Sequence, residues 1–92
     1  MFNDATTLSR HPEATDSRVG DETVILHLGS GTYFGLDPVG SRIWELLDKP
    51  MNAMTLREGL LAEFAVAPEV LAKDMEAFLG QMLEHGILVA GD

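Results

Sequence analysis

Cysteine is absent from this 92-residue chain, which excludes disulfides, thiolate metal sites and thiol catalysis. Long apolar runs are also absent, because no run approaches the roughly 20 residues that a helix needs to cross a bilayer. The N-terminus, Met-Phe-Asn-Asp-Ala-Thr-Thr, lacks the basic-then-apolar order of a secretory signal peptide. These absences favour a cytoplasmic location and no insertion into a membrane.

Basic residues are scarce. Six Lys and Arg face fifteen Asp and Glu, which gives a formal net charge of −9. A domain that binds nucleic acid needs a basic face to neutralise phosphates, yet the third expected helix carries several acidic residues against Lys73 alone. The composition therefore predicts no nucleic-acid partner and no anionic membrane partner, and it leaves a neutral or basic partner open.

Catalytic and metal-binding motifs are missing as well. His11, His27 and His85 fall on the N-terminal segment, a strand and a helix end, and none lies at metal spacing from another ligand. The chain has no nucleophile elbow, no phosphate loop and no His with an evident acidic partner. We therefore expect no catalytic residues, no metal and no cofactor.

The most informative stretch, residues 31–47, changes its hydrophobic period in the middle. Residues 32–36 alternate as in a half-buried strand, and the apolar residues after them have the spacing of one helix face. Asp37 is a favoured N-cap and Pro38 a favoured first helical residue. The stretch therefore predicts a strand, a tight corner and a helix.

The rest of the N-terminal half predicts further strands. We expect residues 1–13 to form a flexible arm with a short strand near Leu8. A weak strand at 15–19 and a clear one at 23–28 precede the strand at 32–36, and glycine-bearing turns separate them. The pattern predicts a three-stranded antiparallel meander.

Three helices are expected in the C-terminal half. The first runs from Pro38 to about Leu47, and the second begins at Thr55, where Thr-Leu-Arg-Glu matches a capping box. The third starts at Pro68, covers about 18 residues and stops before Gly86; residues 87–89 follow as a short extended tail. The expected fold is α+β, a three-stranded antiparallel sheet followed by three helices, winged helix-turn-helix-like, with residues 14–92 as one domain.

Two features suggest a binding surface. If the strand at 32–36 ends the meander, one of its edges is unpaired, and proteins use such edges to add a partner strand. The third helix also has a wide apolar surface, which a domain of this size buries only in part. The alternative is that this surface is all core. The apolar surface of the third helix consists of Val70, Leu71, Met75, Phe78, Leu79, Met82 and Leu83.

These segments together resemble the PqqD-like proteins, the recognition elements for ribosomally made and post-translationally modified peptides. The resemblance spans about residues 15–89 and rests on segments that follow in the family's order. They are Val24-Ile-Leu-His-Leu, Gly31-Thr-Tyr-Phe-Gly-Leu-Asp, Gly40 with Ile43-Trp44-Glu-Leu-Leu47, Val70 with Asp74-Met-Glu-Ala-Phe-Leu-Gly-Gln-Met-Leu83, and Gly86-Ile-Leu88. The Tyr-Phe-Gly-Leu-Asp-Pro-Val-Gly form is similar to free-standing members that accompany lasso-peptide maturation.

The resemblance implies a peptide-binding site. In the family, the leader segment of a precursor peptide adds as a strand to the third strand and packs against the third helix. On this chain it implicates Thr32, Tyr33, Phe34, Gly35 and Leu36 for backbone pairing, and Val70, Asp74, Met75, Phe78 and Met82 for the groove wall. Asp74 interrupts the apolar stripe. Either it pairs with a basic leader residue or a leader amide, or it is a surface charge.

The resemblance also implies partners. For lasso peptides these are a transglutaminase-like leader peptidase and an asparagine-synthetase-like cyclase; other members of the family serve radical enzymes that use S-adenosylmethionine. We expect a non-catalytic module that hands the precursor to a separate enzyme. The alternatives are a winged-helix regulator or interaction protein, and a homodimer through the open sheet edge is compatible with each of them.

Overall fold

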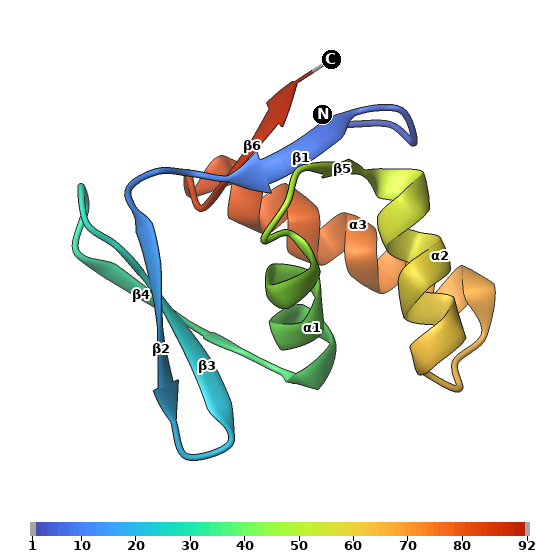
Figure 1. Cartoon of the computed structure of the whole chain (residues 1–92), viewed down its shortest axis with the longest axis horizontal. Coiled ribbons are helices and arrows are strands. Elements are labelled where there is room, and N and C mark those ends of the chain that lie inside the picture. The colour runs from blue at the N-terminus through green and yellow to red at the C-terminus, as the bar shows by residue number, and fades with distance from the viewer. Residues whose placement is uncertain (1, 92) are drawn as a thin grey trace.

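The computed structural model describes residues 2–91. In chain order the elements are β1 (Thr7–Arg10), β2 (Ala14–Val19), β3 (Glu22–His27), β4 (Thr32–Leu36), α1 (Pro38–Leu46), β5 (Met51–Asn52), α2 (Ala53–Glu63), α3 (Pro68–Glu84) and β6 (Leu88–Gly91). The sheet of β2, β3 and β4 projects to one side of the three helices (Figure 1). This arrangement confirms the predicted α+β fold.

The projecting sheet is the predicted meander. Its strand order is β2–β3–β4, and residues 14–19, 22–27 and 32–36 pair antiparallel in continuous register. Gly20 and Gly31 take φ values of 64° and 70° in the two hairpin turns, which glycine adopts without the steric penalty of a Cβ. The short turns hold neighbouring strands in one register.

The two faces of this sheet differ in burial. Ile25 is fully buried, and the cross-strand partners Thr23 and Leu36 on the same face are 5% and 7% exposed. On the opposite face Leu26 lies across from Tyr33, which is 69% exposed. Side chains of a strand alternate between its faces, so the first set joins the core and the second does not.

A second sheet, β5–β1–β6, was not expected from the sequence. Its central strand β1 pairs antiparallel with both neighbours, and Leu8 in β1 is fully buried. A strand near Leu8 and an extended tail near residue 88 are therefore both present. The expectation of a flexible arm is not met for residues 7–10, because they are the middle of a sheet and carry a core side chain.

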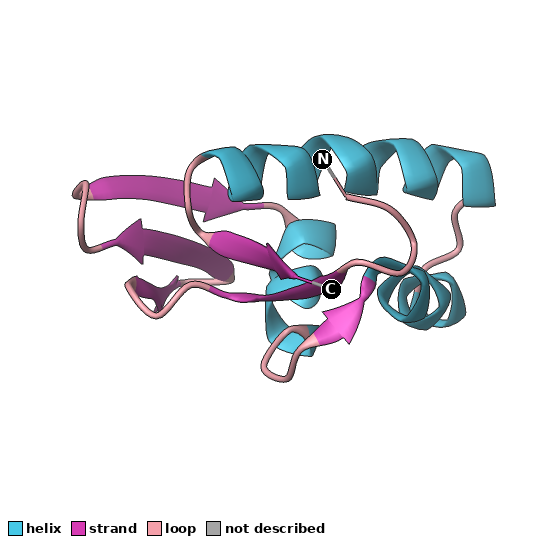
Figure 2. Cartoon of the chain, turned by 90° about the horizontal axis from the view of Figure 1, so that it is seen from above, coloured by secondary structure: helices cyan, strands magenta, loops and turns pink. Residues whose placement is uncertain are grey.

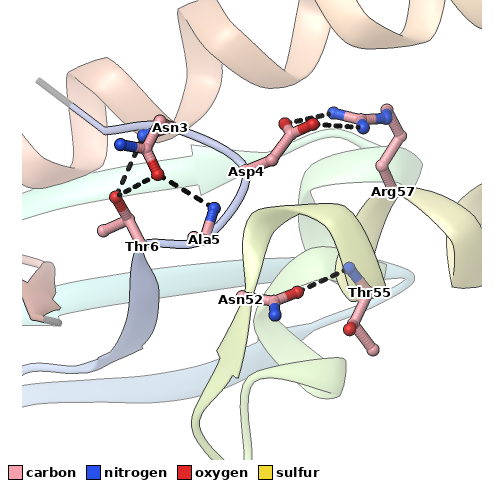
Figure 3. A network of polar contacts seen from close by, with 7 residues as sticks. All are labelled: Asn3, Asp4, Ala5, Thr6, Asn52, Thr55 and Arg57. Carbon is pink, nitrogen blue, oxygen red and sulfur yellow. Dashed lines mark hydrogen bonds and ion pairs between the residues drawn. The ribbon is translucent and has the colours of Figure 1, made fainter.

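Polar contacts hold the segment before β1 against α2 (Figure 3). The carboxylate of Asp4 accepts hydrogen bonds of 2.9 Å and 3.0 Å from the guanidinium of Arg57. The side chain of Asn3 accepts a hydrogen bond from the backbone N–H of Ala5, and the backbone N–H of Asn3 donates to the hydroxyl of Thr6. These bonds shape the turn that leads into β1.

The first helix begins as predicted and the second does not. Asp37 caps α1 by accepting from the N–H of Gly40 at 2.7 Å. In α2 the cap is Asn52, which accepts from the N–H of Thr55 at 2.8 Å (Figure 3), so Thr55 as N-cap was wrong. Asn caps at least as well as Thr, and the earlier start places Ala53 in the core at 2% exposure.

The third helix, α3, begins at Pro68 and ends at Glu84, close to its predicted bounds. Gly86 follows in the left-handed region, with φ 72°. The N–H of Ile87 donates to the carbonyl of Met82, and the N–H of Gly86 donates to the carbonyl of Leu83. This pair of bonds is the Schellman motif, which satisfies carbonyls at a helix C-terminus.

Trp44 of α1 joins both sheets to the helices. Its indole N–H donates to the carboxylate of Asp16 in β2 at 2.6 Å, and the guanidinium of Arg10 in β1 lies 4.1 Å from the ring centroid. Trp44 itself is 3% exposed. Across residues 2–91, no helix has both the length and the apolar character needed to traverse a bilayer.

Candidate functional site

The strand β4 has one free edge. Within residues 2–91 it pairs with β3 alone, and it is the last strand of its sheet. The side of the sheet that carries β4 faces the long helix α3 when the molecule is seen from above (Figure 2). The backbone groups on a free edge are available to a partner strand.

Two neighbouring cavities lie between β4, α1 and α3. The first has a volume of about 420 Å³ and is lined by Tyr33, Phe34, Gly35, Leu36, Asp37, Phe78, Gln81 and Met82. The second has a volume of about 340 Å³ and is lined by Asp37, Val39, Gly40, Ile43, Asp74, Ala77, Phe78 and Gln81. Three residues line both, so we call the continuous hollow the groove.

Phe78 stands at the centre of the groove and is half-buried. A Cβ added to Gly40 would lie 2.9 Å from Cε1 of Phe78. The glycine therefore allows α1 and the Phe78 ring to approach each other closely. The ring of Phe34, which lines the first cavity, lies 4.9 Å from the ring of His85.

The structure places the five predicted strand residues together. Residues 33–36 line the first cavity, and Thr32 begins the same strand. Phe34 and Leu36 turn toward the core side, where Leu36 is buried. The free edge and the first cavity thus share one strand, so a peptide that paired with β4 would also contact the cavity.

The predicted helix residues divide into two groups. Asp74, Phe78 and Met82 line the groove. Met75 is 3% exposed and is part of the core, and its remaining surface faces a different hollow beside Asp4 and Arg57. Val70 is 52% exposed and lines neither cavity of the groove. The structure therefore moves Met75 and Val70 out of the predicted groove wall.

Several groove residues were not predicted as part of the site. On α3 these are Ala77 and Gln81, which lie three and seven residues after Asp74 and so follow one helix face. On the α1 side they are the N-cap Asp37 and the α1 residues Val39, Gly40 and Ile43. The helical spacing is visible in the sequence, but only the packing of α1 against α3 reveals which face lines the groove.

Three potential metal ligands come together away from the groove. His11, Glu13 and His27 each place one ligand atom within 4.8 Å of the others, so the prediction that no histidine lies at metal spacing from another ligand was wrong for His11 and His27. The Nδ1 atoms of His11 and His27 accept backbone N–H groups of Glu13 and Ser30. In neutral imidazole this puts the proton on Nε2, where a metal would need the lone pair. The hydrogen bonding therefore favours a structural turn over a metal site.

The titratable groups with shifted pKa values also lie outside the groove. The hydrogen bonds from Arg57 lower the pKa of the Asp4 carboxyl, and the same contact raises the pKa of Arg57. On α1, Arg42 donates to both carboxylate oxygens of Glu63, which raises the pKa of Arg42. These pairs connect α2 to the N-terminal segment and to α1, so they support the scaffold.

Comparisons with known proteins point to one family. The family model described as Coenzyme PQQ synthesis protein D (PqqD) matches residues 22–88. The structure "TbiB1 in Complex with the TbiA(beta) Leader Peptide" is 35% identical, with a TM-score of 0.78 over 87% of this chain and 93% of that chain. "Lasso peptide synthetase B1 complexed with the leader peptide" is 23% identical, with a TM-score of 0.74 over 89% of this chain and 96% of that chain, and this likeness extends to the fold alone. Among curated proteins, none matches this chain.

Proposed function

The chain belongs to the PqqD family, and we propose that it is a peptide recognition element that binds the leader segment of a ribosomally synthesised precursor. The leader adds as a strand to the free edge of β4, and its side chains enter the groove against α3. One observation carries the proposal: the unpaired edge of β4 borders the groove along residues 33–36.

Two kinds of contact would share the binding energy. Backbone hydrogen bonds to a sheet edge are tolerant of sequence, and pockets for alternate side chains provide selectivity. On the helix side, the first cavity is lined by two apolar side chains, Phe78 and Met82, and by Gln81. Met adapts to the shape of an apolar ligand, so this cavity suits an apolar leader residue.

The leader-peptide complex named for the TbiB1 structure, which is 35% identical to this chain, supports this proposal. The resemblance of the Tyr-Phe-Gly-Leu-Asp-Pro-Val-Gly segment to free-standing members of the family favours a role in lasso-peptide maturation. In that role the module is non-catalytic. It presents the precursor to a separate maturation enzyme, such as a transglutaminase-like leader peptidase. The net charge of −9 favours fast association with a basic leader or a basic enzyme surface.

A titration with synthetic leader peptides tests the proposal. The probes are leaders encoded by small reading frames next to the gene, together with the TbiA(beta) leader peptide. Backbone amide NMR should show binding with shifts at residues 32–36 and 74–82. The strand β2 forms the other edge of the same sheet and serves as an internal control, because its residues 14–19 should shift little.

Two results would contradict strand addition at β4. Shifts confined to β2 would move the site to the opposite edge. The absence of binding to every leader, with a folded protein by circular dichroism, would remove the leader-binding role and favour a general interaction protein. Sedimentation at several concentrations identifies a homodimer through β4, which would compete with the leader for the same edge.

A further inference from the structure

We infer that the groove selects leaders with a Lys or Arg side chain, placed two positions from the residue that fills the first cavity. The inference rests on the proposed leader-binding function and specifies its ligand. It comes from the second cavity, in which an apolar floor lies beneath two carboxylates, Asp37 and Asp74.

The charge of the second cavity has one sign. Asp37 and Asp74 are its charged lining residues, and none of the lining residues is Lys or Arg. Both aspartates are exposed, and within residues 2–91 neither takes part in an ion pair. Three arginines elsewhere in the chain, Arg10, Arg42 and Arg57, are already paired with other acidic residues.

The position of Asp37 is set before any ligand arrives. Its Oδ1 accepts the N–H of Gly40 at 2.7 Å as the N-cap of α1, so the side chain is held at the rim of the cavity while Oδ2 stays available. Asp74 projects from α3 on the facing wall. A cation between the two walls meets both carboxylates at a lower entropic cost than it would on a mobile surface.

The floor suits the stem of a long basic side chain. Val39, Ala77 and Phe78 provide apolar surface between the two carboxylates. Lys and Arg lay their methylene groups along apolar surface and keep the charged group at a polar rim. A purely apolar side chain would instead desolvate the carboxylates without compensation.

The spacing follows from the geometry of strand and helix. The first cavity contacts α3 at residues 78, 81 and 82, and the second at residues 74, 77, 78 and 81. The shift is one helical turn, about 5.4 Å. Side chains on one face of a strand recur every two residues, about 6.6 Å apart. A leader paired with β4 therefore places neighbouring same-face residues in the two cavities.

A paired scan of lysine and norleucine tests the inference. The probes are the leader peptides used above, with each residue replaced in turn by lysine and by norleucine, which keeps the stem without the charge. At one position, two residues from the strongest apolar contact, lysine should bind about three- to tenfold more tightly than norleucine, as expected for exposed ion pairs. The preference should decrease as salt is added.

Two double variants assign the effect to the cavity. Asp37→Asn/Asp74→Asn removes both charges and keeps the cap, because Asn caps as well as Asp. It should abolish the lysine preference. Glu76→Gln/Glu84→Gln changes the net charge equally at exposed α3 positions outside the groove, and it should retain the preference.

Each outcome decides a different point. If leaders bind but no position prefers lysine, the inference is overturned and the proposed function stands. The inference also fails if the preference survives in Asp37→Asn/Asp74→Asn, or if the control double variant loses it to the same degree. If no leader binds the folded protein, the proposed function fails and the inference fails with it.

Discussion

Replacing Gly40 with Ala tests whether the Phe78 ring is a movable wall of the groove. The added Cβ would lie 2.9 Å from Cε1 and 3.3 Å from Cζ of Phe78, and 3.1 Å from Oδ1 of Asp37. Carbon atoms in good contact are about 3.5–4.0 Å apart. The ring must therefore move by roughly half an ångström or more, and the open side available to it is the groove.

The effect on folding should be small. Alanine favours a helix over glycine by about 0.8–1.0 kcal/mol, and displacing a side chain from its preferred rotamer costs about 0.5–1.5 kcal/mol. These terms oppose each other, so the free energy of unfolding of Gly40→Ala should stay within about 1 kcal/mol of the parent.

The effect on binding should be larger. A ring pushed into the groove crowds the leader, and overpacking typically costs about 1–3 kcal/mol. Leader affinity should therefore fall by roughly five- to a hundredfold. Urea denaturation, followed by the fluorescence of the single Trp, measures folding, and calorimetric titration with a binding leader measures affinity.

The matched control is Gly80→Ala on α3. No atom lies within 4 Å of a Cβ added there, and Gly80 lines neither cavity of the groove. This variant should gain about 0.5–1 kcal/mol of stability with unchanged affinity. A loss of more than about 3 kcal/mol in Gly40→Ala, in the range of core truncations, would mean that the ring is fixed in the core. Unchanged stability and affinity would mean that the ring is no part of the binding wall.

Three further predictions concern the scaffold. Asn52→Ala should destabilise the protein by about 0.5–2 kcal/mol in chemical denaturation while Thr55→Ala changes little, and the reverse order would restore Thr55 as the cap of α2. Arg57 lowers the pKa of Asp4, so the stabilisation from this pair is present above the pKa of Asp4 in the unfolded state and is lost as the pH falls through its pKa in the folded state. Carboxyl NMR titration should show a higher Asp4 pKa in Arg57→Gln. An unchanged value would refute the pairing. Trp44→Phe removes the indole N–H that donates to a β2 carboxylate and should cost about 1–3 kcal/mol by thermal unfolding, whereas a neutral result would mean that this bond does not hold the sheet to α1.

The groove is assembled from segments far apart in the chain. Residues 33–36 of β4 form one wall of the groove, and α3 forms the opposite wall around residue 78. Asp37, the N-cap of α1, lies between these walls and lines both cavities. Each segment has a structural role of its own, since Asp37 caps α1 and Met82 is 3% exposed in the core. Substitutions in the groove therefore need stability and affinity measured together.

Local patterns were sufficient for most of the fold. The period-2 alternation at residues 32–36, the Asp37-Pro38 corner and Gly86 after α3 each gave boundaries close to those observed. These features depend on steric and hydrogen-bonding preferences of residues close in sequence. The family resemblance agrees with the match over residues 22–88.

Competition between local signals explains the incorrect cap. Asn52 and Thr55 both suit an N-cap, and the capping-box pattern favoured Thr55. The pairing of β5 with β1 extends the backbone just before Ala53, and this tertiary contact selects the earlier start. β1 itself was treated as an arm because its few apolar residues give little periodicity, although Leu8 is fully buried.

The sequence alone determined the class of fold and a meander that ends in the strand at residues 32–36, because periodicity and capping act within a few residues. The family resemblance, and not these local signals, implied that the third helix faces the open edge of that strand. Tertiary structure decided which side chains of that helix are available. Met75 and Phe78 are three residues apart, yet Met75 lies in the core and Phe78 lines the groove. Their separation depends on how α3 is rotated against α1 and β4, and that rotation is set by packing between segments distant in sequence.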